Sequence, residues 1–199
     1  MESSAPTLAA AEPTPVPGDQ VWNVPNMLSL VRLLLAVAVG GLIEIQWYWL
    51  AAVTFVVAAG TDFVDGWWAR RFNQITKLGR ILDPFVDKII ITAALVALVG
   101  QPASQIAAWM VTLILGRELL VTSLRAMGEG KGGDFSARWL GKWKMVVQCA
   151  AVVSSLLWLH TSEHWLLWST QGLAWAAVLI TVASGVDYVA QALRISKLP

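Results

Sequence analysis

Four aspartates stand close together in an otherwise apolar chain, between residues 61 and 90. Asp62 and Asp65 are three residues apart, so they share one face of a helix. Asp83 and Asp87 are four residues apart and share a face in the same way. Clustered carboxylates at a membrane boundary repel one another unless a cation balances them, and oxygen donors favour Mg²⁺, Mn²⁺ or Ca²⁺ over zinc. The pattern therefore predicts metal-assisted phosphoryl chemistry, with enough acids for two ions.

Small and basic residues accompany these acids at helical spacing. Gly66 and Ala69 lie four and seven positions after the first aspartate, and Gly79 lies four positions before the third. Small side chains leave room for a nucleotide beside the helix backbone, where the forked guanidinium of Arg70 can meet its phosphates. Close helix packing is the alternative explanation for Gly66 and Gly79, and the sequence leaves both open.

The elements that must position these residues are apolar helices. The chain has 199 residues, of which 57% are hydrophobic and 14% charged, a composition typical of a membrane protein. Its net charge of +1 gives no reason to expect a nucleic-acid partner. Apolar stretches long enough to cross a bilayer cover residues 26–43, 47–69, 81–99, 105–127, 142–160 and 170–193. We therefore predict an all-α integral membrane protein with six transmembrane helices.

The distribution of Lys and Arg predicts the orientation of these helices. The connections near 44–46, 100–104 and 161–169 contain neither residue, so they are expected to face outward. The basic connections, both termini and the active site are then expected on the cytoplasmic side of the cell inner membrane. Residues 1–20, rich in Ala and Pro, are predicted to form a disordered cytoplasmic tail, and residues 21–199 a single six-helix catalytic domain.

Written out, the acidic stretch reads Asp62-x2-Asp65-Gly66-x2-Ala69-Arg70-x8-Gly79-x3-Asp83-x3-Asp87. It resembles the complete signature of the CDP-alcohol phosphotransferases, with every fixed position and every spacing kept. Members of this family are six-helix membrane enzymes that transfer a substituted phosphate from a CDP-linked lipid to an alcohol and release CMP. Eight fixed positions over 26 residues make the resemblance specific.

The resemblance implies a division of labour among the acids. Asp62, Asp65 and Asp83 are expected to be the main ligands of two Mg²⁺ or Mn²⁺ ions. Asp87 is expected to act as general base, although sequence alone does not separate a base from a ligand among four aspartates, and Asp87 can serve as both. The expected nucleotide-binding residues are Asp62, Gly66, Ala69, Arg70 and Gly79 of the signature, together with Asn26 and Thr61. Helix capping by Asn26 stays an open alternative.

Further motifs resemble those family members whose acceptor is glycerol 3-phosphate. They are residues 24–32 (VPNMLSLVR), 116–118 (GRE), 124–125 (LR), 141–144 (GKWK) and 184–188 (SGVDY). The resemblance runs from about residue 22 to 192, and Met145 departs from it. It implies transfer of the phosphatidyl group of CDP-diacylglycerol to glycerol 3-phosphate in phosphatidylglycerol biosynthesis. Cations that could bind the acceptor phosphate are Arg117, Arg125, Lys142 and Lys144.

Alternatives remain at this stage for the cations and for the function. The four cations can also snorkel to lipid headgroups as ordinary cytoplasmic-side residues. A sister enzyme would use inositol phosphate, serine or phosphatidylglycerol as acceptor with the same chemistry. A divalent cation transporter would also use buried carboxylates, but closer to the bilayer midplane. The resemblance implies membrane lipids as surroundings and a homodimer, for which the sequence indicates no interface.

Overall fold

The computed structural model describes residues 24–72, 77–129 and 139–196, with side chains at 27–61, 85–86, 88–124 and 143–191. These residues form helices only, which confirms the predicted all-α class. The helices are α1 (Val24–Glu44), α2 (Tyr48–Phe72), α3 (Lys77–Val99), α4 (Ala108–Glu129), α5 (Trp139–Thr161) and α6 (His164–Ser196). Six apolar stretches thus become six helices, in the predicted order.

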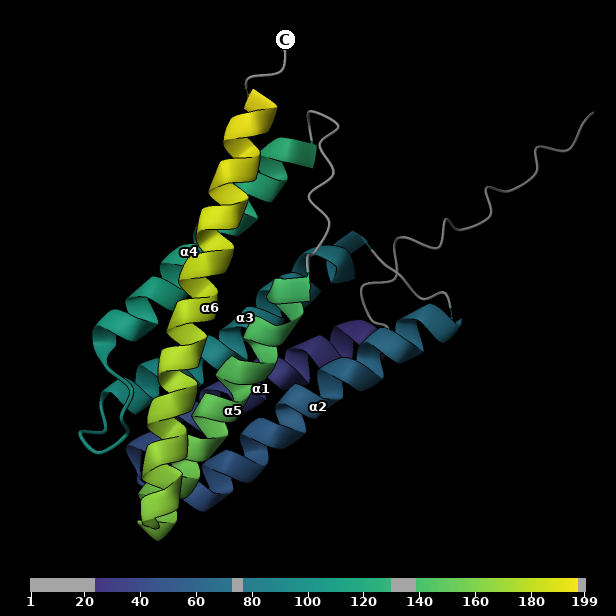
Figure 1. Cartoon of the computed structure of the whole chain (residues 1–199). Coiled ribbons are helices and arrows are strands. Elements are labelled where there is room, and N and C mark those ends of the chain that lie inside the picture. Colours follow the sequence, from purple (N-terminus) through teal and green to yellow (C-terminus); the bar gives the residue numbers. More distant parts are fainter. Residues whose placement is uncertain (1–23, 73–76, 130–138, 197–199) are drawn as a thin grey trace, which may run out of the picture.

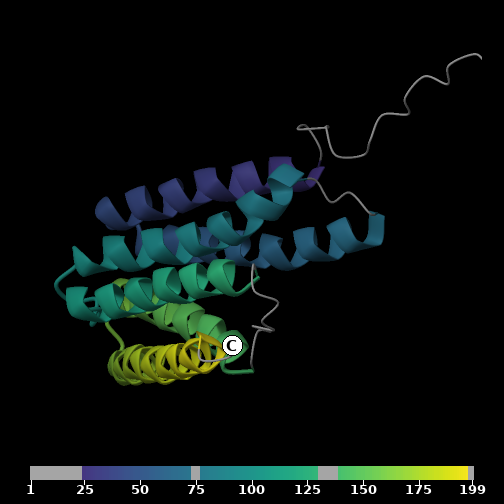
Figure 2. The ribbon, with the colours of Figure 1, turned by 90° about the horizontal axis from the view of Figure 1, so that it is seen from above.

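All six helices run between the same two ends of the bundle (Figures 1 and 2). Helices α1, α3 and α5 begin, and α2, α4 and α6 end, at the end that we call the aspartate end. Helix α1 packs against α2 and α3, while α6 packs against α4 and α5, and α2 also contacts α5. The alternating directions agree with the predicted alternation of basic and neutral connections.

Two of the three connections at the opposite end are short, and in each of them a single residue in the left-handed conformation follows the helix. Gln46, with φ 63°, follows α1, and the next amide, of Trp47, donates to the carbonyl of Leu42 at 2.9 Å. This hydrogen bond belongs to the Schellman motif, which satisfies the last carbonyls of a helix. The left-handed position of that motif is usually glycine, so Gln is uncommon there. Ser162, with φ 57°, ends α5 in a comparable way.

The predicted start of the sixth helix is wrong by six residues. Helix α6 begins at His164, so the connection after α5 consists of Ser162 and Glu163 rather than residues 161–169. Hydroxyl groups near the predicted boundary bond to α5, which holds this part of α6 against that helix. Ser154 of α5 lies 3.0 Å from Ser169 and 2.8 Å from Thr170, oxygen to oxygen.

Three of the helices are long and apolar enough to cross a membrane on the residues described. They are Met27–Glu44, Trp143–Thr161 and His164–Gln191 in α1, α5 and α6. Shorter apolar segments lie in α2 (Tyr48–Thr61) and α3 (Lys88–Val99). Large apolar side chains are exposed along the outer faces of the bundle, as a protein surrounded by lipid requires. The helices therefore support a membrane protein, while a count of six crossings stays a prediction.

Candidate active site

The backbone brings both aspartate pairs to one end of the bundle. Asp62 stands ten residues before Phe72, the last residue of α2, and Asp87 stands ten residues after Lys77, the first residue of α3. At 1.5 Å per residue, both positions lie about 15 Å from the end of their helix. Because α2 and α3 are antiparallel and contact each other, the two pairs occupy matching levels. The side chains of the four aspartates lie outside the described part of the structure.

The residues predicted to bind the nucleotide belong to the same end. Gly66, Ala69 and Arg70 lie in α2, Gly79 in the first turn of α3, and Asn26 in the first turn of α1. Their side-chain contacts, like those of the aspartates, are outside the described residues. The backbone alone therefore agrees with a shared nucleotide site.

Thr61, just before the first aspartate, has a described side chain. Its hydroxyl donates to the carbonyl of Ala58 in its own helix at 2.7 Å. Thr61 is one of the residues predicted to bind the nucleotide. In this structure the donor is used within α2, and the hydroxyl oxygen can still accept a bond.

Two of the four predicted acceptor-site cations meet at one carboxylate. Lys144 of α5 bonds through Nζ to Oε1 of Glu118 in α4, and Arg117 Nη1 lies 3.2 Å from that same oxygen. Lys144 is only 7% exposed. Arg117 and Glu118 are neighbours in the sequence, whereas the sequence did not indicate that Glu118 also pairs with Lys144.

Helix α6 fixes the other side of Arg117. Arg117 Nη2 donates to Oγ of Ser184, and its guanidinium carbon lies 5.3 Å from the ring centre of Tyr188, a cation–π distance. A Cβ added to Gly185 would come within 3.3 Å of Arg117 Cγ, so this glycine gives the arginine stem its space. Three residues of the motif at 184–188 thus surround Arg117: Ser184, Gly185 and Tyr188.

Lys88 is a contact residue that the sequence reasoning missed. It follows Asp87 directly in α3, and its Nζ donates to Oγ1 of Thr122 in α4. The Thr122 hydroxyl in turn donates to the backbone carbonyl of Glu118 at 2.7 Å. A lysine inside an apolar stretch was the available signal. We refer to Lys88, Arg117, Glu118 and Lys144 as the charged cluster.

The backbone relates the two remaining predicted cations to this cluster differently. Arg125 follows Glu118 by seven residues and Thr122 by three, so it occupies the same face of α4. Lys142 precedes Lys144 by two residues in α5, which places it about 200° around the helix axis. The helix therefore groups Arg125 with the cluster and separates Lys142 from Lys144.

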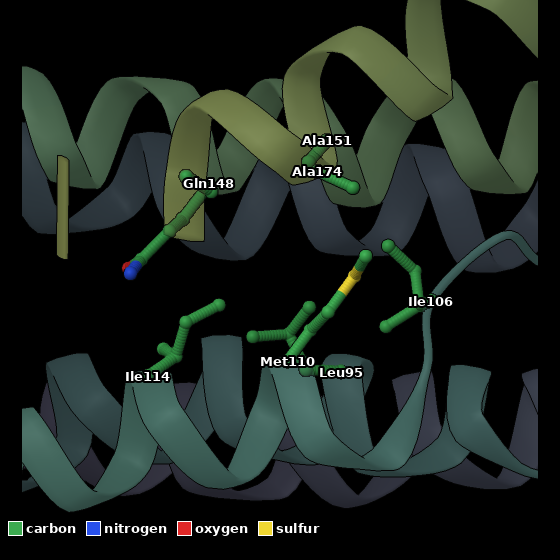
Figure 3. A pocket seen from close by; sticks show the side chains of 8 residues that line it. Leu95, Ile106, Met110, Ile114, Gln148, Ala151 and Ala174 are labelled. Carbon is green, nitrogen blue, oxygen red and sulfur yellow. The ribbon is translucent and has the colours of Figure 1, made fainter. Parts of the chain in front are cut away.

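A small cavity lies among α3, α4, α5 and α6 (Figure 3). Its lining is apolar except for Gln148, which follows Lys144 by one helical turn. Gln148 reaches Thr181 Oγ1 at 3.4 Å, and Figure 3 shows it across the cavity from Ile114. With no charged lining residue, this space is a packing gap and not a candidate for phosphate chemistry. The other lining residues are Leu95, Ile106, Met110, Ala151, Ala174 and Ala177.

Comparison with known proteins identifies the class. The profile of the CDP-alcohol phosphatidyltransferases matches residues 22–189. The chain therefore belongs to this family, and the predicted family and enzyme class are confirmed.

Curated relatives make the comparison more specific. A Bacillus subtilis (strain 168) protein is 37% identical over 185 residues, which cover 84% of this chain and 94% of the relative. A Cereibacter sphaeroides protein is 37% identical over 172 residues, which cover 82% of this chain and 76% of the relative. An Escherichia coli (strain K12) protein is 33% identical over 180 residues, which cover 86% of this chain and 95% of the relative. Each relative is named CDP-diacylglycerol–glycerol-3-phosphate 3-phosphatidyltransferase.

Proposed function

We propose that this protein transfers the phosphatidyl group of CDP-diacylglycerol to glycerol 3-phosphate, producing phosphatidylglycerophosphate and CMP. The observation that carries the proposal is the joint placement of the two aspartate pairs and the charged cluster. Lys88 of the cluster is the immediate neighbour of Asp87 and contacts α4. This neighbourhood supports an acid site for a diphosphate beside a basic site for a second phosphate. The names of the relatives support the same donor and acceptor.

The aspartates suit divalent metal ions because they offer only oxygen donors, two from each of two antiparallel helices. Asp62, Asp65 and Asp83 would hold two Mg²⁺ or Mn²⁺ ions, with Asp87 as a further ligand. When bound, such ions withdraw negative charge from the diphosphate of the donor.

The chain's own residues then perform the transfer. Asp87 accepts the proton of the primary hydroxyl of glycerol 3-phosphate as that oxygen attacks the β-phosphorus of CDP-diacylglycerol. A new oxygen–phosphorus bond forms, the phosphoanhydride bond breaks, and CMP leaves with the bonding electrons. Arg70 holds the phosphates of the nucleotide, and Gly66 and Gly79 leave space for it beside the helices.

The second phosphate explains the basic residues beyond the signature. Glycerol 3-phosphate brings a dianion, which requires cations that the nucleotide does not already use. Arg125 shares the face of α4 that carries Glu118, so it is the first choice for a direct contact. A cytoplasmic orientation would bring this soluble substrate to the site, while the donor keeps its acyl chains among membrane lipids.

The decisive test is CMP release by the purified protein with CDP-diacylglycerol and Mg²⁺. Glycerol 3-phosphate, inositol phosphate, serine, phosphatidylglycerol and no acceptor are compared in parallel. Release that depends on glycerol 3-phosphate supports the proposal, and release with another acceptor assigns a sister reaction. If no acceptor gives CMP release, a divalent cation transporter becomes the better explanation. Metal binding that CMP does not affect would then support that alternative.

The role of Asp87 has its own test. The Asp87→Asn variant keeps the size of the side chain and loses the base, so turnover should be abolished while CMP binding is largely kept. Wild-type turnover in this variant would contradict the assignment. Glu163→Gln, in the connection at the opposite end, is the matched control and should behave as the wild type.

A further inference from the structure

Glu118 is a buried acid in a region expected to bind an anion. Its side chain is 17% exposed, and those of Arg117 and Lys144 are each 9% exposed. A carboxylate here reduces the positive potential that an acceptor phosphate would meet. The proposed transfer reaction uses the cations and gives this acid no task, so its presence needs a separate reason.

The contacts indicate that Glu118 sets the positions of two cations. Arg117 comes from α4 and Lys144 from α5, and both bond to the same oxygen, Oε1. Two buried cations repel each other, and a lysine with four methylene groups extends toward water when nothing holds it. A shared carboxylate removes both tendencies. It keeps the ammonium and the guanidinium next to each other and inside the bundle.

The backbone of Glu118 connects the same group to the acid site. Its carbonyl accepts the Thr122 hydroxyl at 2.7 Å, and that hydroxyl accepts Lys88 Nζ. The chain of contacts thus runs from α5 through α4 to Lys88 in α3, the residue that follows Asp87. A shift of Glu118 would therefore disturb the spacing between the cations that receive the acceptor phosphate and the predicted base that receives its proton.

The charges of the cluster also match the acceptor. Lys88, Arg117 and Lys144 carry three positive charges and Glu118 one negative charge, which leaves two positive charges. A phosphate monoester carries about −1.5 to −2 at neutral pH. The cluster as it stands thus balances one such group.

We propose that Glu118 is the positioning residue of the acceptor-phosphate site: it holds Arg117 and Lys144 at a fixed separation and couples them to Asp87. This inference rests on the proposed function. Glu118 itself makes no contact with the reacting atoms and acts through the two cations.

The test compares Glu118→Asp with Glu118→Gln in the full-length protein. Aspartate keeps the charge and is one methylene shorter, so it cannot reach both cations from the same backbone position. Glutamine keeps the length and a carbonyl acceptor but loses the charge. The KM for glycerol 3-phosphate, the KM for CDP-diacylglycerol, kcat and thermal unfolding in detergent are measured for each. Glu163→Gln, exposed at the opposite end, is the matched control.

A positioning role predicts a divided result. The KM for glycerol 3-phosphate should rise on the order of tenfold in Glu118→Asp and in Glu118→Gln, because each loses part of a charge-assisted pair. The KM for CDP-diacylglycerol should stay within about twofold of the wild type, and the control should be unchanged in both constants.

Two other outcomes overturn the inference. If only the sum of charges matters, Glu118→Asp leaves the acceptor KM unchanged and Glu118→Gln lowers it. If Glu118 only braces the helices, the variants unfold at lower temperature and keep the wild-type acceptor KM. The double variant Glu118→Met with Lys144→Met guards against misfolding: it replaces the buried pair between α4 and α5 by apolar residues, while Arg117 keeps its bond to Ser184 and its contact with Tyr188. A wild-type acceptor KM in that folded protein also contradicts positioning.

Failure of the proposed function has a different signature. It appears in the wild type itself, as no CMP release that depends on glycerol 3-phosphate. In that case, binding of labelled glycerol 3-phosphate without donor is compared in the wild type and Glu118→Asp. Weaker binding by the variant supports the inference, and equal or absent binding overturns it.

Discussion

Gly185→Ala tests whether α6 places Arg117. The new Cβ would lie 3.3 Å from Arg117 Cγ, and ordinary carbon contacts are about 3.5–4.0 Å. The arginine must therefore retreat by a few tenths of an ångström. It cannot retreat freely, because Ser184 and Glu118 bond its two terminal nitrogens and Tyr188 covers its guanidinium.

The expected effects of Gly185→Ala on stability and on acceptor binding differ in size. Alanine in place of glycine stabilises a helix interior by about 1 kcal/mol, which offsets the cost of the close contact. Hydrogen bonds to charged groups contribute about 1.5–3 kcal/mol, and partial loss of one such bond costs about 1 kcal/mol. We therefore expect stability close to that of the wild type, together with an acceptor KM that is about fivefold higher.

Gly116→Ala provides the matched control. Gly116 precedes Arg117 in α4, and a Cβ at this position meets nothing within 4 Å. The control gains the same helix propensity without the contact, so it should unfold at a higher temperature and keep the wild-type acceptor KM. Both variants are assayed by CMP release at varied glycerol 3-phosphate and by thermal unfolding in detergent. Equal acceptor KM values for the two alanine variants would refute the placement of Arg117 by α6.

Two further predictions concern the opposite end and the metal. Gln101→Leu removes the partner of the Tyr48 hydroxyl (2.9 Å) and the bond to the Ile43 carbonyl (3.2 Å), so thermal unfolding should show a loss of about 1–3 kcal/mol while the acceptor KM stays unchanged. A raised acceptor KM in this variant would mean that the two ends are coupled. Exhaustive chelation of divalent ions should abolish CMP release and added Mg²⁺ should restore it, whereas persistent activity after chelation would remove the metal from the proposal.

Local sequence patterns predicted most of the helices and the candidate acid site. Each helix of the structure begins and ends within a few residues of an apolar stretch, except at the start of α6. The aspartate signature is also local, since its eight positions lie within 26 residues. Periodicity alone was sufficient to separate Lys142 from Lys144, because two residues span more than half a helical turn. That consequence was not drawn from the sequence.

The missed features depend on partners distant in the chain. Ser169 was assigned to the connection before the sixth span, because its contact with Ser154 of another helix is not visible in a local pattern. The sharing of Glu118 with Lys144 joins residues 26 positions apart, and the contact between Lys88 and Thr122 joins residues 34 apart. Such pairs follow from the packing of α3, α4 and α5, which no local pattern specifies.

In the described part of the bundle, neutral polar contacts and buried charged groups lie in different places, and we infer different roles for them. At the opposite end, the buried or half-buried polar contacts are neutral. Ser155 donates to the carbonyl of Ser104 at 2.7 Å, and the Trp158 indole donates to that of Ala103 at 2.8 Å. Such pairs satisfy the backbone of the 100–107 connection at a small desolvation cost.

Charged groups toward the aspartate end require a different explanation. Burying Arg117, Glu118 and Lys144 costs much more than burying hydroxyl groups, and apolar residues of similar volume would pack the same helices at least as well. Stability alone therefore does not account for the charges. Arg117 and Lys144 are explained by a site that must receive a dianion. Glu118 is explained by the need to hold these two cations close to each other and inside the bundle. Loss of acceptor affinity without loss of stability is the result that this reasoning requires of the Glu118 variants.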